Sequence, residues 1–185
     1  MSLELLIGPM FAGKSSELIR RIRRVKVINK SYMVIKPSID TRYSNNKIIS
    51  HNKESNECYI LNNLRDIYNN EYYINNNISE IFIDEAQFFT DLKDTVIELV
   101  EKYNKNIVIA GLICDFNRNK FGQILDLLPY CDMDRICPTT ALCLHCMDGT
   151  LASFSNRTKK ENSQVLIGES DLYSSLCRKH YNEMN

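Results

Sequence analysis

Residues 3–21 read LELLIGPMFAGKSSELIRR, an apolar run that leads into two glycines, a lysine and two serines. Four positions in this stretch fit the pattern G-x-x-x-x-G-K-[ST]: Gly8, Gly13, Lys14 and Ser15. The apolar run 3–7 predicts a short buried strand, and residues 16–25 have the spacing of an amphipathic helix. Strand, glycine loop and helix in this order predict a phosphate site, because the backbone N–H groups of the loop and the helix N-terminus both attract anions. Lys14 would bridge the outer phosphates, and the Ser15 hydroxyl would be a ligand of Mg²⁺.

Length and charge limit what the chain can be. Its 185 residues suffice for one medium-sized domain with a single good core and a small appendage. Lysine plus arginine equals aspartate plus glutamate, 23 of each, so we expect a small substrate and no nucleic-acid partner. No apolar run approaches the about 20 residues of a membrane span, and the N-terminus lacks a signal-peptide pattern. We therefore expect a cytoplasmic protein without a membrane partner.

Strand and helix patterns alternate along the rest of the chain. The predicted buried strands are residues 31–38, the apolar part of 78–89, and 106–113. The predicted helices are residues 61–70 and 92–105. The polar segment 40–56 and the asparagine-rich segment 69–77 predict loops. Continuously apolar strands between helices predict an α/β fold, a P-loop NTPase-like parallel sheet with helices on both faces.

Two adjacent acids, Asp84 and Glu85, follow the apolar segment EIFI. The carboxyl end of a core strand is where P-loop proteins place the carboxylate that organises Mg²⁺. Neighbouring side chains at a strand end point in different directions, so Asp84 can serve the metal while Glu85 reaches a substrate hydroxyl. This division suits phosphoryl transfer to an alcohol with Glu85 as general base. A helix N-cap followed by a first-turn acid is the alternative reading.

Two residue pairs near the C-terminus have the spacing of a zinc ribbon. Cys143 and Cys146 form C-x-x-C, and Cys177 and His180 form C-x-x-H. Four such ligands leave no open coordination position, so the predicted zinc is structural. His145 is a rival fourth ligand, although its place inside the first pair disfavours it.

The composition changes at about Thr139, where paired cysteines and small polar residues begin. We therefore expect a P-loop α/β domain in residues 1–138 and a zinc-ribbon-like lobe with a substrate-covering loop in residues 139–185. The cysteines outside the zinc pairs are expected to be plain buried or half-buried thiols: Cys58, Cys114, Cys131 and Cys137.

Several segments together resemble the type II thymidine kinase family: GPMFAGKSSELIRRIRR, DTRY, FIDEAQFF, DFNRNKFG, CLHC, VLIGESDLY and CRKH. They occur in family order and extend from Leu3 to Tyr181. The resemblance implies transfer of the ATP γ-phosphate to the 5′-hydroxyl of thymidine or deoxyuridine, giving dTMP from thymidine in pyrimidine salvage for DNA synthesis. It also implies a homotetramer and feedback inhibition by dTTP. The residues before Phe116 differ from the LDGTF of animal and poxviral members, and CRKH ends in histidine rather than their cysteine.

The resemblance also assigns roles to individual residues. The triphosphate would be held by Gly8, Pro9, Met10, Phe11, Ala12, Gly13, Lys14, Ser15, Asp40, Asp84 and Gln87. The catalytic residues would be Glu85 as base, Lys14 and Arg42, with Mg²⁺ held by Ser15 and Asp84. The substrate would be lined by Met10, Phe88, Phe116, Phe121, Gln164, Val165, Leu166, Ile167, Gly168 and Tyr173. The backbone of segment 164–168 would pair with the thymine edge, although pattern alone places each of the aromatic residues more often in a core than in a pocket.

Two other functions fit part of this pattern. The first is a kinase for another nucleoside, since the phosphate, Mg²⁺ and base arrangement does not depend on the acceptor's ring. The second is a nucleotide-switched or nucleic-acid-binding zinc-ribbon protein. The balanced charge, the adjacent acids and the lack of a basic aromatic stripe around the cysteine pairs argue against it.

Overall fold

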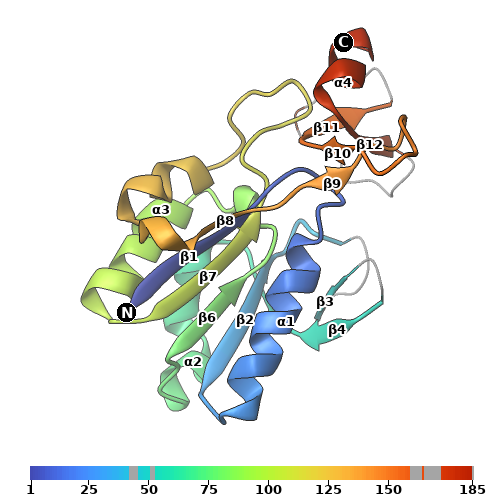
Figure 1. Cartoon of the computed structure of the whole chain (residues 1–185). Helices are drawn as coiled ribbons and strands as arrows, with labels where there is room; N and C mark the ends of the chain where they lie inside the picture. The colour runs from blue at the N-terminus through green and yellow to red at the C-terminus, as the bar shows by residue number, and fades with distance from the viewer. Residues whose placement is uncertain (42–45, 51–52, 159–163, 165–171, 185) are drawn as a thin grey trace.

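The computed structural model describes residues 1–41, 46–50, 53–158, 164 and 172–184 (Figure 1). Within these residues the central sheet is formed by six strands: β1 (Ser2–Ile7), β2 (Tyr32–Pro37), β5 (Tyr59–Leu61), β6 (Glu80–Ile83), β7 (Asn106–Gly111) and β8 (Ile136–Pro138). Their order is β5-β2-β6-β7-β1-β8, and each neighbouring pair runs parallel. The predicted α/β class with a parallel sheet is confirmed.

Helices and turns connect these strands. The α-helices are α1 (Lys14–Val27), α2 (Glu71–Asn75), α3 (Leu92–Ile97) and α4 (Arg178–Met184). Helix α3 continues as a π-helical turn, Glu98–Lys102. The predicted helix 92–105 is therefore present from Leu92 to Lys102, and its last turn is π-helical. Four 3₁₀ turns complete this set: Leu64–Asn69, Ala86–Phe88, Ile124–Tyr130 and Met133–Arg135.

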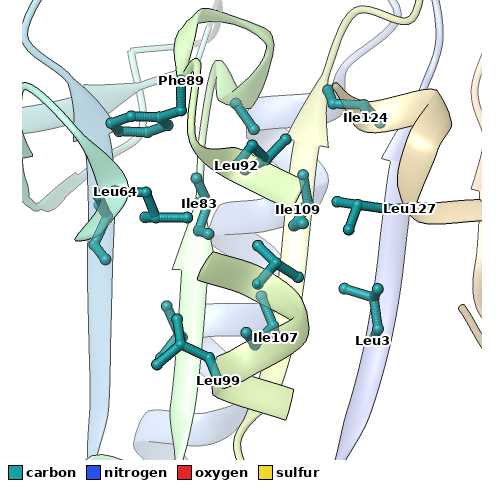
Figure 2. Packing of buried hydrophobic residues seen from close by; sticks show 14 of the residues in the cluster. Leu3, Leu64, Ile83, Phe89, Leu92, Leu99, Ile107, Ile109, Ile124 and Leu127 are labelled. Atoms are coloured by element: carbon teal, nitrogen blue, oxygen red, sulfur yellow. The ribbon is translucent and has the colours of Figure 1, made fainter. Parts of the chain in front are cut away.

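Both faces of the central sheet are buried, because successive side chains of each strand point to opposite sides. One face packs against α3, its π-helical turn and the 124–130 turn through a core that includes Leu3, Ile83, Ile107, Ile109, Leu92, Leu99, Ile124 and Leu127 (Figure 2). The other face packs against α1 through Leu6, Val34, Phe82, Val108, Leu18, Ile19 and Ile22. The odd and even residues of the strands thus supply two separate cores, which explains their continuously apolar sequences.

The prediction of a helix over residues 61–70 was wrong in part. Leu61 ends strand β5, and the helical part is the 3₁₀ turn Leu64–Asn69. Its buried residues, Leu64 and Ile67, are three positions apart, which matches the three residues per turn of a 3₁₀-helix. Apolar spacing over so short a segment fits either helix type, and here the preceding residues pair with the sheet.

The prediction of loops over residues 40–56 and 69–77 was also wrong in part. The first segment contains most of a hairpin of β3 (Lys47–Ile49) with β4 (Ser55–Glu57), held by Ile48 in the core beneath α1. The second contains α2, whose first turn is capped by the Asn70 side chain. The Asn70 side-chain oxygen accepts hydrogen bonds from two backbone N–H groups, so asparagine here begins a helix.

The C-terminal lobe lies beyond one end of the sheet (Figure 1). Its strands form two antiparallel pairs: β9 (Ala141–Leu142) with β10 (Leu151–Ala152), and β11 (Phe154–Arg157) with β12 (Tyr173–Leu176). A small core of its own includes Ala152, Leu176 and Tyr181, and Ala12 from the loop after β1 packs against it. The division into domains 1–138 and 139–185 stays a prediction. Among the described residues, no helix combines the length and apolarity needed to span a membrane.

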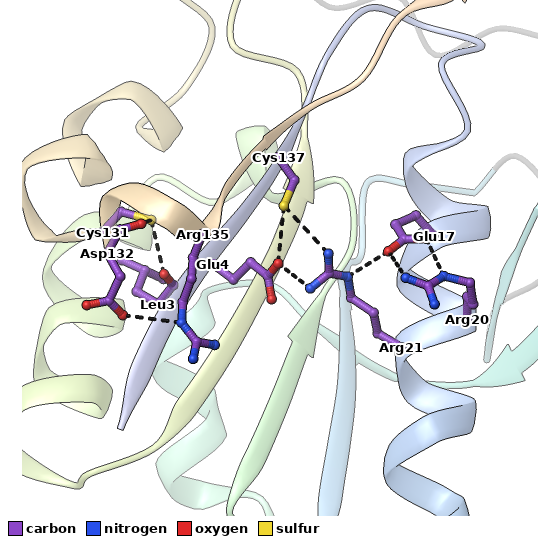
Figure 3. A network of polar contacts seen from close by, with 9 residues as sticks. All are labelled: Leu3, Glu4, Glu17, Arg20, Arg21, Cys131, Asp132, Arg135 and Cys137. Atoms are coloured by element: carbon purple, nitrogen blue, oxygen red, sulfur yellow. Dashed lines mark hydrogen bonds and ion pairs between the residues drawn. The ribbon is translucent and has the colours of Figure 1, made fainter.

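A polar network joins α1 to the strands β1 and β8 (Figure 3). The Arg21 guanidinium forms an ion pair with Glu4 on β1 and a second one with Glu17, one turn earlier in its helix, at 2.9 Å. The Cys137 thiol of β8 donates to Glu4 at 3.2 Å. The Arg21 and Glu4 side chains are only 20% and 12% exposed, so these contacts are shielded from water.

Glu4→Gln is expected to lower the free energy of unfolding by about 1–3 kcal/mol, because the half-buried Arg21 would then face a neutral amide. The control is Arg23→Gln, which breaks the exposed Arg23–Glu54 pair and should change the same quantity by less than about 0.5 kcal/mol. Urea denaturation followed by circular dichroism measures both. Equal effects of the two variants would contradict a stabilising role for the network.

Candidate active site and metal centre

The loop between β1 and α1 has the backbone that the glycine pattern predicts. Gly13 adopts φ 76° and directly precedes α1, a left-handed conformation that favours glycine. A Cβ atom at Gly8 would lie 2.4 Å from the carbonyl oxygen of Thr139, where the chain leaving β8 crosses the loop. The Thr139 N–H donates to the Ile7 carbonyl at 2.7 Å, which holds this crossing in place. The first glycine therefore allows a close approach, and the second allows the turn into the helix.

Lys14 and Ser15 lie at the first turn of α1. The buried Lys14 ammonium group donates to the Pro9 carbonyl at 2.7 Å and so points back into its own loop. The Ser15 hydroxyl donates to a carboxylate oxygen of Asp84 at 3.2 Å. This hydrogen bond joins the glycine loop to the end of β6, although the two lie 69 positions apart in sequence and β7 separates their strands in the sheet.

The acidic pair after β6 is arranged by an unusual backbone conformation. Glu85 adopts φ 50° and ψ 39°, which is uncommon for a residue with a side chain and often marks a functional site. Its N–H donates to the Asp84 carboxylate at 3.1 Å, and its own carboxylate accepts from the Gln87 amide at 2.6 Å. Gln87 in turn accepts from the Leu112 N–H at 3.0 Å. In these hydrogen bonds the two carboxylates have different partners, and Gln87 connects Glu85 to the residue that follows β7.

Asp40, predicted to lie near the phosphates, forms an ion pair with Lys36 at 3.8 Å. Lys36 is only 2% exposed, and it follows Ile35, which is paired with Ile83 in the neighbouring strand β6. Parallel pairing in this register puts Lys36 beside Asp84 at the strand ends. Sequence reasoning overlooked Lys36, although a lysine inside the apolar run YMVIKP is a signal that could have found it.

Cys58 lies close to the same charges. Burial raises the pKa of its thiol to about 11, with the Lys36 ammonium opposing the shift and the Asp84 and Asp40 carboxylates adding to it. A thiol with so high a pKa is protonated at neutral pH and is a poor nucleophile. This agrees with the expectation of a plain buried thiol.

The predicted substrate-lining residues fall into two groups. Phe88 and the largely buried Phe121 meet edge to face, with ring centroids 5.4 Å apart. Met10 is connected to the lobe, because its N–H donates to the Ser155 hydroxyl of β11 at 2.9 Å. Ser155 was not predicted, and a small polar residue in a short strand carries no distinctive sequence signal.

The second group lies around a buried arginine. Tyr173 accepts a hydrogen bond from Arg157 at 2.8 Å, the Gln164 carbonyl accepts another at 3.1 Å, and the Phe116 ring lies under the guanidinium group. The Gln164 amide donates to the buried Asp115 carboxylate at 2.9 Å. Arg157 and Asp115 were not predicted as site residues. Arg42 and the segment Val165, Leu166, Ile167 and Gly168 lie outside the described residues.

The four predicted zinc ligands lie together in the lobe. The sulfur atoms of Cys143, Cys146 and Cys177 lie 3.6, 3.3 and 3.4 Å from His180 Nδ1, and the sulfurs of Cys146 and Cys177 are 3.9 Å apart. A tetrahedral zinc ion with usual bond lengths places its ligand atoms about 3.5–3.8 Å apart. His145 lies outside this group of four, and its ring packs against that of His180 with centroids 4.2 Å apart. The arrangement can hold a zinc ion.

The environment of Cys143 favours a thiolate. Burial raises its pKa, but hydrogen bonds from the backbone at Cys177, Cys146 and His145 and from the His180 ring outweigh burial and lower the pKa to about 5. Thiolates are the form in which cysteine binds metals. Burial and the neighbouring Cys143 and Cys177 side chains raise the pKa of Cys146 to about 11, so of these two sulfurs Cys143 is the one that the protein alone favours as a thiolate.

A glycine loop connects β1 to α1 in a parallel sheet, and Ser15 at its end is hydrogen-bonded to Asp84 after β6. This arrangement defines a P-loop nucleotide-binding protein of the α/β class. A family model described as thymidine kinase matches residues 1–181. The chain therefore belongs to the thymidine kinase family, and it is an ATP-dependent nucleoside kinase, a transferase.

Individual relatives agree with this assignment. The chain is 38% identical over 179 residues to a thymidine kinase of Bacteroides thetaiotaomicron, covering 97% of this chain and 86% of that protein. It is 38% identical over 185 residues to a thymidine kinase of Amsacta moorei entomopoxvirus, covering 98% of each. A thymidine kinase of Oryza sativa is 36% identical over 181 residues, covering 97% of this chain and 65% of that protein.

Proposed function

We propose that this enzyme transfers the γ-phosphate of ATP to the 5′-hydroxyl of thymidine, and of deoxyuridine, to give the 5′-monophosphate. The observation that carries the proposal is the hydrogen bond between Ser15 and Asp84, because it brings the glycine loop and the acid after β6 within reach of one Mg²⁺ ion. The relatives named thymidine kinase support thymidine as the acceptor.

The phosphates would bind to the loop from Gly8 to Ser15, with Asp40 and Gln87 nearby. Lys14 would exchange the Pro9 carbonyl, its present acceptor, for phosphate oxygens. Ser15 and Asp84 would hold Mg²⁺, which when bound neutralises charge on the phosphate oxygens.

Glu85 would be the general base that takes the proton of the 5′-hydroxyl. The Gln87 amide donates to the Glu85 carboxylate at 2.6 Å, and the Ser15 hydroxyl donates to the Asp84 carboxylate, which would serve the metal. A base orientated in this way can act on a hydroxyl while its neighbour serves the metal. Arg42, as a further catalytic residue, would add positive charge near the phosphates.

Glu85→Gln should lower kcat by about 10²–10⁴-fold and leave nucleotide binding nearly intact, because the change removes proton affinity without changing volume. Single-turnover kinetics with Mg-ATP and thymidine, together with a nucleotide-binding titration, measure the two effects. The control is Glu101→Gln, an exposed position on the π-helical turn after α3, which should behave like the wild type. A Glu85→Gln rate within a few-fold of wild type would assign the base to another group.

The nucleoside would lie between the P-loop and the lobe, lined by Met10, Phe88, Phe116, Phe121, Gln164 and Tyr173. Segment 165–168 would continue this lining with backbone groups directed at the pyrimidine edge. The contact of Met10 with Ser155 supports such a site, because it brings the loop and β11 together.

The test of the proposed function is a panel of nucleosides with Mg-ATP, compared by kcat/KM. Thymidine and deoxyuridine should exceed deoxycytidine and the purine deoxynucleosides. Deoxycytidine presents a donor where thymidine presents an acceptor, and each buried backbone group left unpaired costs about 1–3 kcal/mol. Purines would be excluded by size. Efficient phosphorylation of deoxycytidine or deoxyadenosine would favour a kinase for another nucleoside.

We also propose that the Cys143, Cys146, Cys177 and His180 cluster binds a structural zinc ion. The interatomic spacings and the donor set of three thiols and one imidazole support this. Four protein ligands leave no position for substrate, so zinc would stabilise the lobe and take no part in the reaction.

The purified protein should contain about one zinc ion per chain, as expected for a four-ligand structural site. His180→Ala should lose the metal, because the remaining thiolates leave one coordination position open. His145→Ala is the matched control, since it removes the neighbouring ring and should keep the metal. Elemental analysis of both variants measures this. Metal retained by His180→Ala and lost by His145→Ala would reverse the choice of ligand.

By resemblance to the family we further propose a homotetrameric assembly, feedback inhibition by dTTP, a cytoplasmic location and a role in pyrimidine salvage for DNA synthesis.

A further inference from the structure

Arg157 lies at the end of β11 and is only 7% exposed. It is paired with Tyr173 of β12 in the antiparallel ladder, so the two side chains share one face of this ribbon. Ser155, two positions earlier in β11, points to the same face and accepts the Met10 N–H. The face that carries Arg157 is therefore the face turned toward the P-loop.

The Arg157 guanidinium contacts three segments of the chain. Its carbon lies 4.0 Å from the centre of the Phe116 ring and 5.3 Å from the centre of the Tyr173 ring. One terminal nitrogen donates both to the Tyr173 hydroxyl at 2.8 Å and to the Gln164 carbonyl at 3.1 Å. A flat, delocalised cation suits this combination, because it can stack on a ring and donate hydrogen bonds in its own plane.

The loop that carries Phe116 is held from two other directions. The Tyr181 hydroxyl of α4 donates to the Phe116 carbonyl at 2.5 Å, and the Gln164 amide donates to the neighbouring Asp115 carboxylate at 2.9 Å. The segment of Asp115 and Phe116 is therefore contacted by three residues of the lobe, Arg157, Gln164 and Tyr181. These contacts fix the position of the Phe116 ring.

We propose that Arg157 is a positioning residue for the nucleoside, which holds the rings of Phe116 and Tyr173 in the arrangement that receives a flat pyrimidine base. The inference rests on the proposed function for the identity of the ligand. Arg157 acts through its neighbours, so its removal should weaken nucleoside binding and leave the phosphate chemistry at Lys14, Asp84 and Glu85 unchanged.

The experiment compares Arg157→Met with Arg118→Met. Arg118 also stacks on aromatic rings, 4.7 Å from Tyr181 and 5.9 Å from Phe154, but it is exposed and contacts neither Tyr173 nor Gln164 in the described structure. Arg157→Met should raise KM for thymidine by about 10–100-fold, with kcat within about 3-fold of wild type and KM for ATP unchanged. Arg118→Met should leave all three constants close to wild type.

A double-mutant cycle with Tyr173→Phe tests the contact itself. Tyr173→Phe keeps the ring and removes the hydroxyl that accepts from Arg157, so it should raise KM for thymidine by a smaller factor. The double variant should show less than the product of the two single factors, because both changes remove one shared interaction. Should Arg157→Met fail to fold, Arg157→Lys, which keeps the charge but lacks the planar fork, takes its place with the same expected direction.

Hydrogen exchange of the unliganded protein separates this inference from the proposed function. Residues 112–120 and 172–176 should exchange faster in Arg157→Met and at the wild-type rate in Arg118→Met. Four results would each overturn the positioning role. For Arg157→Met they are unchanged exchange, an unchanged KM for thymidine, or a loss confined to kcat. The fourth is that the effects of Arg157→Met and Tyr173→Phe multiply independently in the double variant. If the wild type failed to phosphorylate thymidine, the proposed function and the nucleoside as ligand would both be overturned. Hydrogen exchange of the unliganded protein would still decide whether Arg157 holds the rings of Phe116 and Tyr173 in place.

Discussion

Strands β1, β2, β6 and β7 run parallel, so their carboxyl ends meet at one edge of the sheet, and the rest of the structure depends on this alignment. The segments that follow these strands bring Ser15, Asp40, Asp84 and Asp115 to that edge. Helix α1 covers one face of the sheet and α3 covers the other, which leaves the strand ends as the place where polar groups can gather. The chemistry of the site is thus a consequence of strand direction.

Several charged groups at this edge of the sheet are buried, although burying a charge by itself lowers the stability of a protein. Lys14, Lys36 and Asp84 are each less than 10% exposed, and burial of a charge is unfavourable unless partners replace the lost water. Each has such a partner: a loop carbonyl, a neighbouring carboxylate or a serine hydroxyl. The left-handed backbone at Glu85 adds local strain. These unfavourable features lie at one place, as expected where function opposes stability.

The lobe depends on contacts beyond its own small core. Few buried side chains support it, and a unit of this size usually needs a metal or other covalent connection. The Cys/His cluster brings Cys143, which directly follows β9, next to His180 in α4. Strands β11 and β12 lie between these two residues in the sequence, so the cluster closes the segment that contains them. Contacts from Ser155 to the P-loop and from Tyr181 to the Phe116 carbonyl then join the lobe to the sheet edge. A metal bound at this cluster would therefore stabilise the part of the lobe that contacts the P-loop.

Local patterns in the sequence determined the P-loop, the acidic pair, the zinc-ligand spacing and the parallel α/β class, because each is set by neighbouring residues or by a short apolar period. Short elements such as α2 and the 3₁₀ turn at Leu64–Asn69 depend on capping and on pairing with distant strands, so the pattern misassigned them. Lys36 and Arg157 gain their places only when separate strands and loops meet. The sequence by itself thus determined which groups are candidates for the chemistry. Tertiary structure decided which buried residues surround them, because contacts between distant segments produce no periodic pattern in the sequence.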